Sequence, residues 1–163
     1  MAIDIYLQIG DIKGESADDK HKGWIEVSHV GWGVSQPRST SVSTAGGHTS
    51  GTADLSEMIF TKTADLSSPG LFQHCAMGKT IPKAVFEFMR ADGDGKPINY
   101  YKVELENVII ASVHPNSGAG SVLTEQIHLA YSKIKCSYTQ QKIAGGAGGS
   151  TMGGWDAAAK KPV

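Results

Sequence analysis

The stretch Gly23–Pro37, which reads G-W-I-E-V-S-H-V-G-W-G-V-S-Q-P, constrains the fold more than any other part of the chain. Its β-branched and aromatic residues predict a strand, yet it is much longer than the usual ~5–6 residues. Ile25 and Val27 share one face, whereas Val30 and Trp32 share the opposite face. Because side chains alternate along a strand, the buried face changes only at a bend or bulge. We therefore expect this strand to serve two surfaces, its own barrel core and a neighbouring subunit.

Other segments also show the period-2 alternation of half-buried strands. A second change of apolar face falls near Tyr131–Lys133. Two such changes indicate a bent, closed sheet, so we predict a mainly β fold: a compact antiparallel β-barrel of two bent sheets with one flanking α-helix. The further expected strands are Ile3–Ile9, Asp54–Lys62, Ile81–Met89, Tyr101–Val113 and Val122–Gln140.

The helix is expected over about residues 68–78. Ser68 is a suitable N-cap, Pro69 suits the first helical position, and Gly78 suits the residue after the end. Two pairs of residues, each spaced one turn apart, form an apolar stripe along the helix. These pairs are Leu71 with Cys75 and Phe72 with Ala76.

Two segments lack the apolar residues needed to pack by themselves. Residues 35–52 form an extended Ser, Thr and Gly loop, which we expect to become ordered against another copy. Residues 142–163 are expected to be a flexible Gly-rich tail in which Trp155 anchors onto another surface. The predicted division is a barrel domain over residues 1–141 and this tail, with no fused effector domain.

Composition excludes several classes of protein. The 15 basic and 16 acidic residues are scattered, with a net charge of −1, which argues against a nucleic-acid partner. No apolar run reaches the ~18 residues of a membrane span, and the start M-A-I-D-I-Y lacks the basic residues of a secretory signal. The two cysteines, Cys75 and Cys136, suggest free thiols in a reduced cytosol, although pairing stays open.

No catalytic, metal or cofactor site is predicted. Gly78-Lys79-Thr80 lacks the first glycine and the preceding strand of a phosphate-binding loop. Around Asp92-Gly93-Asp94-Gly95 the first and twelfth positions of a calcium loop would be Arg90 and Tyr101, where carboxylates are required. The six histidines show no paired metal-ligand spacing.

The chain resembles the haemolysin-coregulated protein family, Hcp, the tube proteins of type VI secretion systems. The resemblance rests on G-D-I-x-G-E-S at Gly10–Ser16, then His21, and W-I-E-V at Trp24–Val27. It continues through F-T-K-x-x-D-x-x-S-P-x-L at Phe60–Leu71. Further matches are Trp32-Gly33, Gly78-Lys79 with Ile81, Leu123–Glu125 and Gly154–Asp156, in the order of the family and over essentially the whole chain. Thr80, where many members carry His, and Gly31, where a serine or other small residue is common, depart from the pattern.

The resemblance implies a phage tail-tube-like barrel that forms homohexameric rings, stacked into a hollow tube. It implies a contractile sheath, a VgrG-type spike protein and small effector cargo as partners. It also implies a cytoplasmic protein exported by the system itself, without a signal peptide. The alternative that we keep is a small secreted hydrolase or toxin on the same scaffold. The residues expected at subunit or ring-stacking interfaces are Gly31, Trp32, Gly33, Arg38, Gly46, Gly47, His48 and Trp155.

Overall fold

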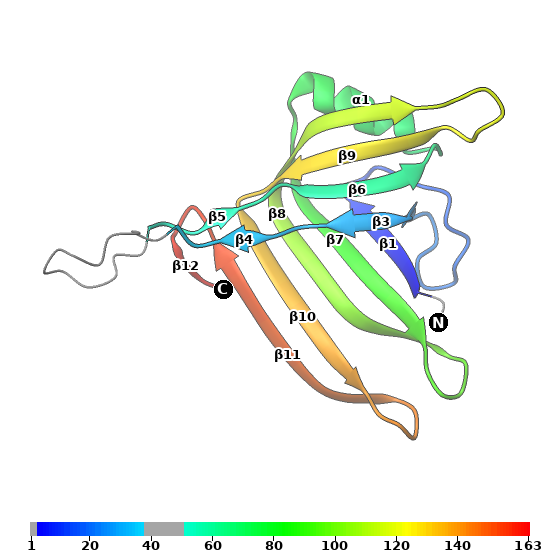
Figure 1. Ribbon diagram of the computed structural model, residues 1–163, viewed down its shortest axis with the longest axis vertical. Coiled ribbons are helices and arrows are strands. Elements are labelled where there is room, and N and C mark those ends of the chain that lie inside the picture. Colours follow the sequence, from blue (N-terminus) through cyan, green and yellow to red (C-terminus); the bar gives the residue numbers. More distant parts are fainter. Residues whose placement is uncertain (1–2, 38–50) are drawn as a thin grey trace, which may run out of the picture.

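The computed structural model describes residues 3–37 and 51–163 (Figure 1). The described chain is mainly β with one helix, and its strand pairings are antiparallel, as predicted. Its elements are β1 Ile3–Ile9, β2 Ile25–Val27, β3 His29–Gly31, β4 Val34–Ser35, β5 Asp54–Leu55, β6 Met58–Thr63, α1 Ser68–Met77, β7 Thr80–Ala91, β8 Pro97–Asn116, β9 Thr124–Ala130, β10 Lys133–Gln141, β11 Ala147–Asp156 and β12 Lys161–Pro162.

The strand pairings follow a circuit around the core. From β1 the order runs through β7, β8, β9 and β6 to β3. The circuit closes because β3 continues directly from β2, which pairs with β1. Only Ser28 separates β2 from β3, and its N–H bonds to the Thr61 carbonyl of β6. The long predicted strand therefore bends at Ser28 and passes from one side of the barrel to the other.

Burial confirms the change of face along this strand. Ile25 and Val27 are buried in the core, whereas Ser28 and His29 are consecutive exposed residues. Beyond these two residues, Val30 and Trp32 pack against the core. The core-facing side chains therefore change from odd-numbered to even-numbered positions along the strand. The strand does not continue unbroken, because β4 leaves the barrel and pairs only with β5.

Strand β8 changes partner at its middle. Its first part pairs with β10 and its last part with β9, while β7 lies along its other edge. Asn107 stands at this junction with φ of 54°, in the left-handed region, and its side chain bonds to Ser132 Oγ. Ser132 lies between β9 and β10, so the change of face predicted near Tyr131–Lys133 is confirmed. The regular alternation predicted over Tyr101–Val113 was wrong, because the bend at Asn107 buries Val108 and Ile110 and exposes Ile109.

The helix is shifted slightly from its predicted start. Ser67 is the N-cap, and Ser68 is the first helical residue, followed by Pro69. Gly78 ends the helix with φ of 63°, as expected for a residue that needs the left-handed region. Only Leu71 of this helix is buried; the predicted stripe through Phe72 is wrong, since that side chain is exposed.

The prediction of a flexible tail over residues 142–163 was wrong. Strand β11 pairs with β10 along its length, with Asp156 opposite Lys133 at one end and Ala147 opposite Gln141 at the other. This pairing extends the sheet away from the barrel (Figure 1). Glycine weakens a strand because it adds no side-chain packing, but its backbone N–H and C=O still form a ladder. Gly154 is even required, since a Cβ there would lie 3.0 Å from Lys135 Cα. Cys75 and Cys136 are both free thiols.

Candidate subunit interface

An apolar groove lies where β4 and β5 approach the extended sheet of β10 and β11. Its volume is about 470 Å³, and every lining residue that the structure describes is uncharged. Three of the predicted interface residues line this groove: the neighbours Trp32 and Gly33, and Trp155, which lies far from them in the sequence. The remaining lining residues are Val34, Gln36, Ala53, Leu55, Ile134, Cys136, Gly153 and Gly154.

The floor of the groove continues into an aromatic cluster. The Trp32 ring lies 5.8 Å from the rings of both Phe88 and Tyr101. Burial raises the pKa of Tyr101 to about 12, so this phenol stays neutral at physiological pH. Tyr138 extends the cluster outwards, 6.5 Å from Tyr101, and is itself exposed. The groove is therefore an uncovered continuation of the hydrophobic core.

Two polar features mark the groove as an unfinished surface. The indole N–H of Trp155 is buried and has no hydrogen-bond partner among the residues that the structure describes. A buried donor without an acceptor costs about 1–3 kcal/mol. In addition, the outer edge of β11 pairs within the described chain only with β12, at Trp155 and Asp156. An open strand edge offers backbone donors and acceptors to another chain.

The other predicted interface residues lie elsewhere. Gly31 is on β3 but does not line the groove, and a Cβ there would meet nothing within 4 Å. Residues Arg38, Gly46, Gly47 and His48 fall outside the described residues. Sequence reasoning missed Gly153, because no strand was expected after residue 141. It placed Ile134 and Cys136 on an expected strand but, without β11 beside them, did not assign them to an interface. The repeated Gly-Gly pairs gave no alternation from which β11 could be recognised.

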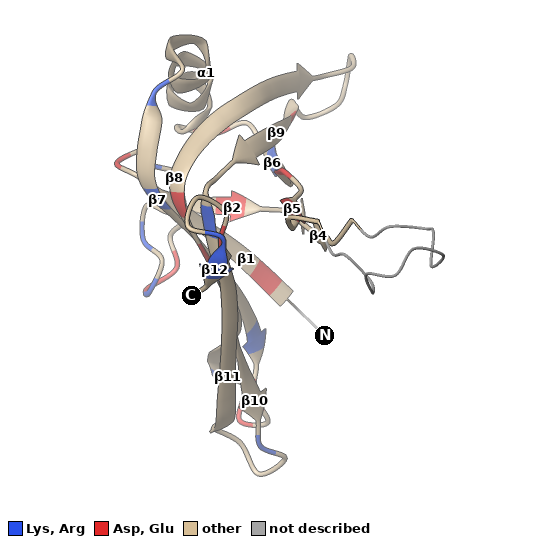
Figure 2. Cartoon of the chain, turned by 90° about the vertical axis from the view of Figure 1, so that its left-hand side faces the viewer, with Lys and Arg blue, Asp and Glu red and all other residues tan. Residues whose placement is uncertain are grey.

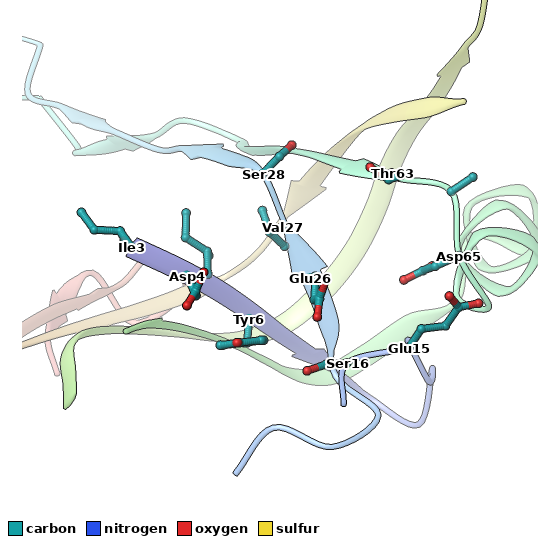
Figure 3. Close-up of a pocket in the computed structure, with 12 residues that line it drawn as sticks. Ile3, Asp4, Tyr6, Glu15, Ser16, Glu26, Val27, Ser28, Thr63 and Asp65 are labelled. Carbon is teal, nitrogen blue, oxygen red and sulfur yellow. The ribbon is translucent and has the colours of Figure 1, made fainter. Parts of the chain in front are cut away.

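A second hollow, of about 570 Å³, is acidic (Figure 3). Its carboxylates come from Asp4 on β1, Glu15 in the following loop, Glu26 on β2, and Asp65 before α1. Covering these charges would remove their hydration, which is costly without cationic partners. The apolar groove presents no such cost, so it is the better surface for contact with a protein.

Residues that carry the sequence resemblance take part in two ionic clusters. In the first, fully buried Lys62 donates to Asp65 Oδ1 at 2.8 Å and to Ser68 Oγ at 3.0 Å, and pairs with Glu125 at 2.8 Å. Lys62 and Glu125 are directly opposite each other on β6 and β9. Ser68 Oγ also donates to Glu125 at 2.8 Å, which ties the start of α1 to the barrel. This cluster is structural, since its polar groups satisfy one another.

The second cluster fastens the loop between β1 and β2 to the barrel. His21 is 2% exposed; its Nδ1 lies 2.6 Å from Asp18 Oδ2 and its Nε2 2.7 Å from Glu87 Oε2. Each nitrogen faces a carboxylate, an arrangement that the doubly protonated ring satisfies by donating twice. The ring stacks on Tyr6 at 4.3 Å and meets the edge of Trp24 at 4.8 Å.

The stability contributed by Asp18 is expected to depend on pH. The hydrogen bond from His21 lowers the pKa of the Asp18 carboxyl below its ordinary value. A lowered folded-state pKa gives stability that is present above the unfolded value, ~3.9, and is lost as the pH falls through the folded value. Urea unfolding of wild type and Asp18→Asn should therefore differ at about pH 5 and converge towards about pH 2. A difference that stays constant over this range would contradict the assignment.

No helix in the described residues has the length and hydrophobicity of a membrane span. Within residues 3–37 and 51–163, no group of three or more His, Cys, Asp or Glu side chains is placed to hold a metal ion.

The fold and the groove define a class: a small antiparallel β-barrel with one helix and an uncovered apolar surface beside an extended sheet. Residues 6–138 match the family described as "Type VI secretion system effector, Hcp". The chain is 35% identical over 158 residues to Protein hcp1 of Pseudomonas aeruginosa PAO1, covering 96% of each. This chain belongs to the Hcp family of type VI secretion proteins.

Solved structures agree with this assignment. A structure titled as a type six secretion system protein superposes with a TM-score of 0.91 at 29% identity, covering 99% of this chain and all of the other. Hcp1 from Salmonella typhimurium gives a TM-score of 0.79 at 34% identity, with both chains fully covered. The similarity of fold therefore extends over essentially the whole chain.

Proposed function

We propose that this chain is the structural subunit of the inner tube of a type VI secretion system and that six copies form a closed ring. The observation that carries the proposal is the apolar groove beside the open edge of β11. The described residues of a single chain leave this extension of the core in contact with water, and covering it with protein is favourable. In a ring, the same groove on each copy would receive a different surface of the next copy.

The sheet that carries the groove has two unlike faces. On its polar face Lys102 pairs with Glu104 at 3.5 Å, and Lys133 with Glu106 at 3.3 Å. Figure 2 shows basic and acidic positions interspersed along the strands. Partly exposed pairs of this kind contribute little to stability but keep a face hydrated. This contrast supports contact between copies through the groove face and leaves the polar face in water.

We further propose that the rings stack into a hollow tube within a contractile sheath, tipped by a VgrG-type spike, with small effectors as cargo. The protein would then be cytoplasmic before the system fires and secreted afterwards, without a catalytic step of its own. Family membership supports these proposals. Because β11 continues the barrel sheet, we propose that residues 142–163 act with the barrel as one unit.

Size-exclusion chromatography and negative-stain imaging of the purified protein test the ring. We expect particles of six copies with a central hole, and a mass that is unchanged at about 1 M salt. Salt at this concentration screens exposed charges to about 3 Å but leaves apolar contacts intact. A monomer at high protein concentration would overturn the proposal and favour the hydrolase or toxin. Dissociation in salt would show that charged contacts, rather than the groove, hold the copies together.

A further inference from the structure

The connection between β8 and β9 presents apolar side chains to water. Residues 117–123 read S-G-A-G-S-V-L and contain no charge. Val122 is 69% exposed and Leu123 39% exposed. The backbone here is ordered by its own bonds: Ser121 N–H donates to the Gly118 carbonyl at 3.0 Å, and Ala64 N–H to the Leu123 carbonyl at 2.9 Å. This hairpin tip, residues 117–123, therefore presents apolar side chains on a defined backbone.

The hairpin tip and the groove lie on opposite sides of the molecule. In Figure 1 the tip is at the far right, where β8 ends and β9 begins, whereas β4, β5 and the upper ends of β10 and β11 lie to the left. A ring made of identical copies requires two different patches, one on each side of every subunit. The placement of the tip and the groove meets this requirement.

The two surfaces also match chemically. Within residues 3–37 and 51–163, neither surface contains a charged residue, so contact between these parts would bury no unpaired ion. The other exposed apolar residues include Phe72 and Met77 of α1. A helix with its side chains is ~10–12 Å wide, broader than a hairpin tip, and fits a narrow groove less well.

We propose that the groove receives the β8–β9 hairpin tip of a second copy of this chain, with Val122 and Leu123 inserted towards Trp32 and Trp155. This inference rests on the proposed ring and names the contact that closes it. Each subunit inserts its tip into one neighbour and receives the tip of the other.

A disulfide trap tests the contact directly, because the groove already contains a thiol. Val122→Cys should form an intermolecular disulfide with native Cys136 under mild oxidation, since a disulfide needs Cα atoms within about 7 Å. Non-reducing gels should show multimers, and mass spectrometry should identify the linked peptides. The cross-link should be lost in Val122→Cys/Cys136→Ala. Ile143→Cys, at an exposed position in the turn between β10 and β11, is the matched control and should not link to Cys136.

A second pair of variants covers the case in which the thiols lie too far apart to join. A Cβ at Gly153 meets nothing within 4 Å, so Gly153→Leu should fold while filling the groove and abolishing the ring. Gly149→Leu lies on the same strand outside the groove, has the same free space, and should keep the ring. Rings in Gly153→Leu, or a cross-link to Cys75 instead of Cys136, would overturn the contact while the proposed ring stands. Absence of rings in the wild type would instead refute the proposed function.

Discussion

Replacing Lys62 with Ala is expected to lower the free energy of unfolding by about 3–5 kcal/mol, the cost of breaking a buried ion pair by removing one partner. Lys62 is fully buried and is the cation between Asp65 and Glu125, each at 2.8 Å. Without it, two carboxylates would face each other in the protein interior. Urea unfolding monitored by circular dichroism, at one fixed protein concentration, measures the change; the fixed concentration matters because assembly adds stability.

Two further variants separate the charge effect from lost packing. Lys62→Met with Asp65→Asn and Glu125→Gln removes all three charges and should recover much of the loss, because a buried ion pair is often worth no more than a neutral replacement. Lys83→Ala breaks an exposed pair with Glu104 at 3.1 Å and should cost less than about 1 kcal/mol. A Lys62→Ala protein as stable as Lys83→Ala would contradict the role assigned to this cluster.

Replacing His21 with Ala should cost about 3 kcal/mol, because two hydrogen bonds to charged partners are lost, each worth about 1.5–3 kcal/mol. His21 connects Asp18 of the β1–β2 loop with Glu87 of β7, so its loss should also release the loop. Faster amide hydrogen exchange over residues 10–24 would report this release.

His21→Phe keeps an aromatic ring against Tyr6 but makes neither hydrogen bond, so it separates stacking from ionic pairing. We expect it to recover only a minor part of the stability. The matched control is His128→Ala, which breaks an outer pair with Glu57 at 3.0 Å and should cost less than about 1 kcal/mol. If His21→Ala and His128→Ala lowered the free energy of unfolding equally, burial would not strengthen the pairs that His21 makes.

The ionic clusters show how far contacts between side chains could be predicted from the sequence. The motif residues Lys62, Asp65, Ser68 and Glu125 carried the family resemblance, but nothing in their spacing placed Glu125 beside Lys62. That contact depends on the register between β6 and β9. The same holds for His21, whose partner Glu87 lies 66 residues away. We interpret both clusters as structural, because their contacts lie within one chain.

The groove shows the opposite limit. Trp155 was predicted as an interface residue because it is a large apolar side chain in a glycine-rich segment, and Trp32 because its strand was expected to serve two surfaces. The sequence did not predict that they would line the same surface, nor that the tail would form a strand. Glycine has no side-chain periodicity, so the ladder between β10 and β11 left no pattern in residues 142–156.

The sequence alone determined the mainly β class, the single helix, the change of buried face within Gly23–Pro37 and near Tyr131, and membership of the Hcp family. Each of these follows from alternation, capping residues or ordered motifs, which are properties of neighbouring residues. Only the tertiary structure decided the order of strands, the partners of Lys62 and His21, the ordered tail, and the groove between β5 and β11. These depend on contacts between residues far apart in the chain, which are fixed by register and packing of the whole sheet rather than by local pattern.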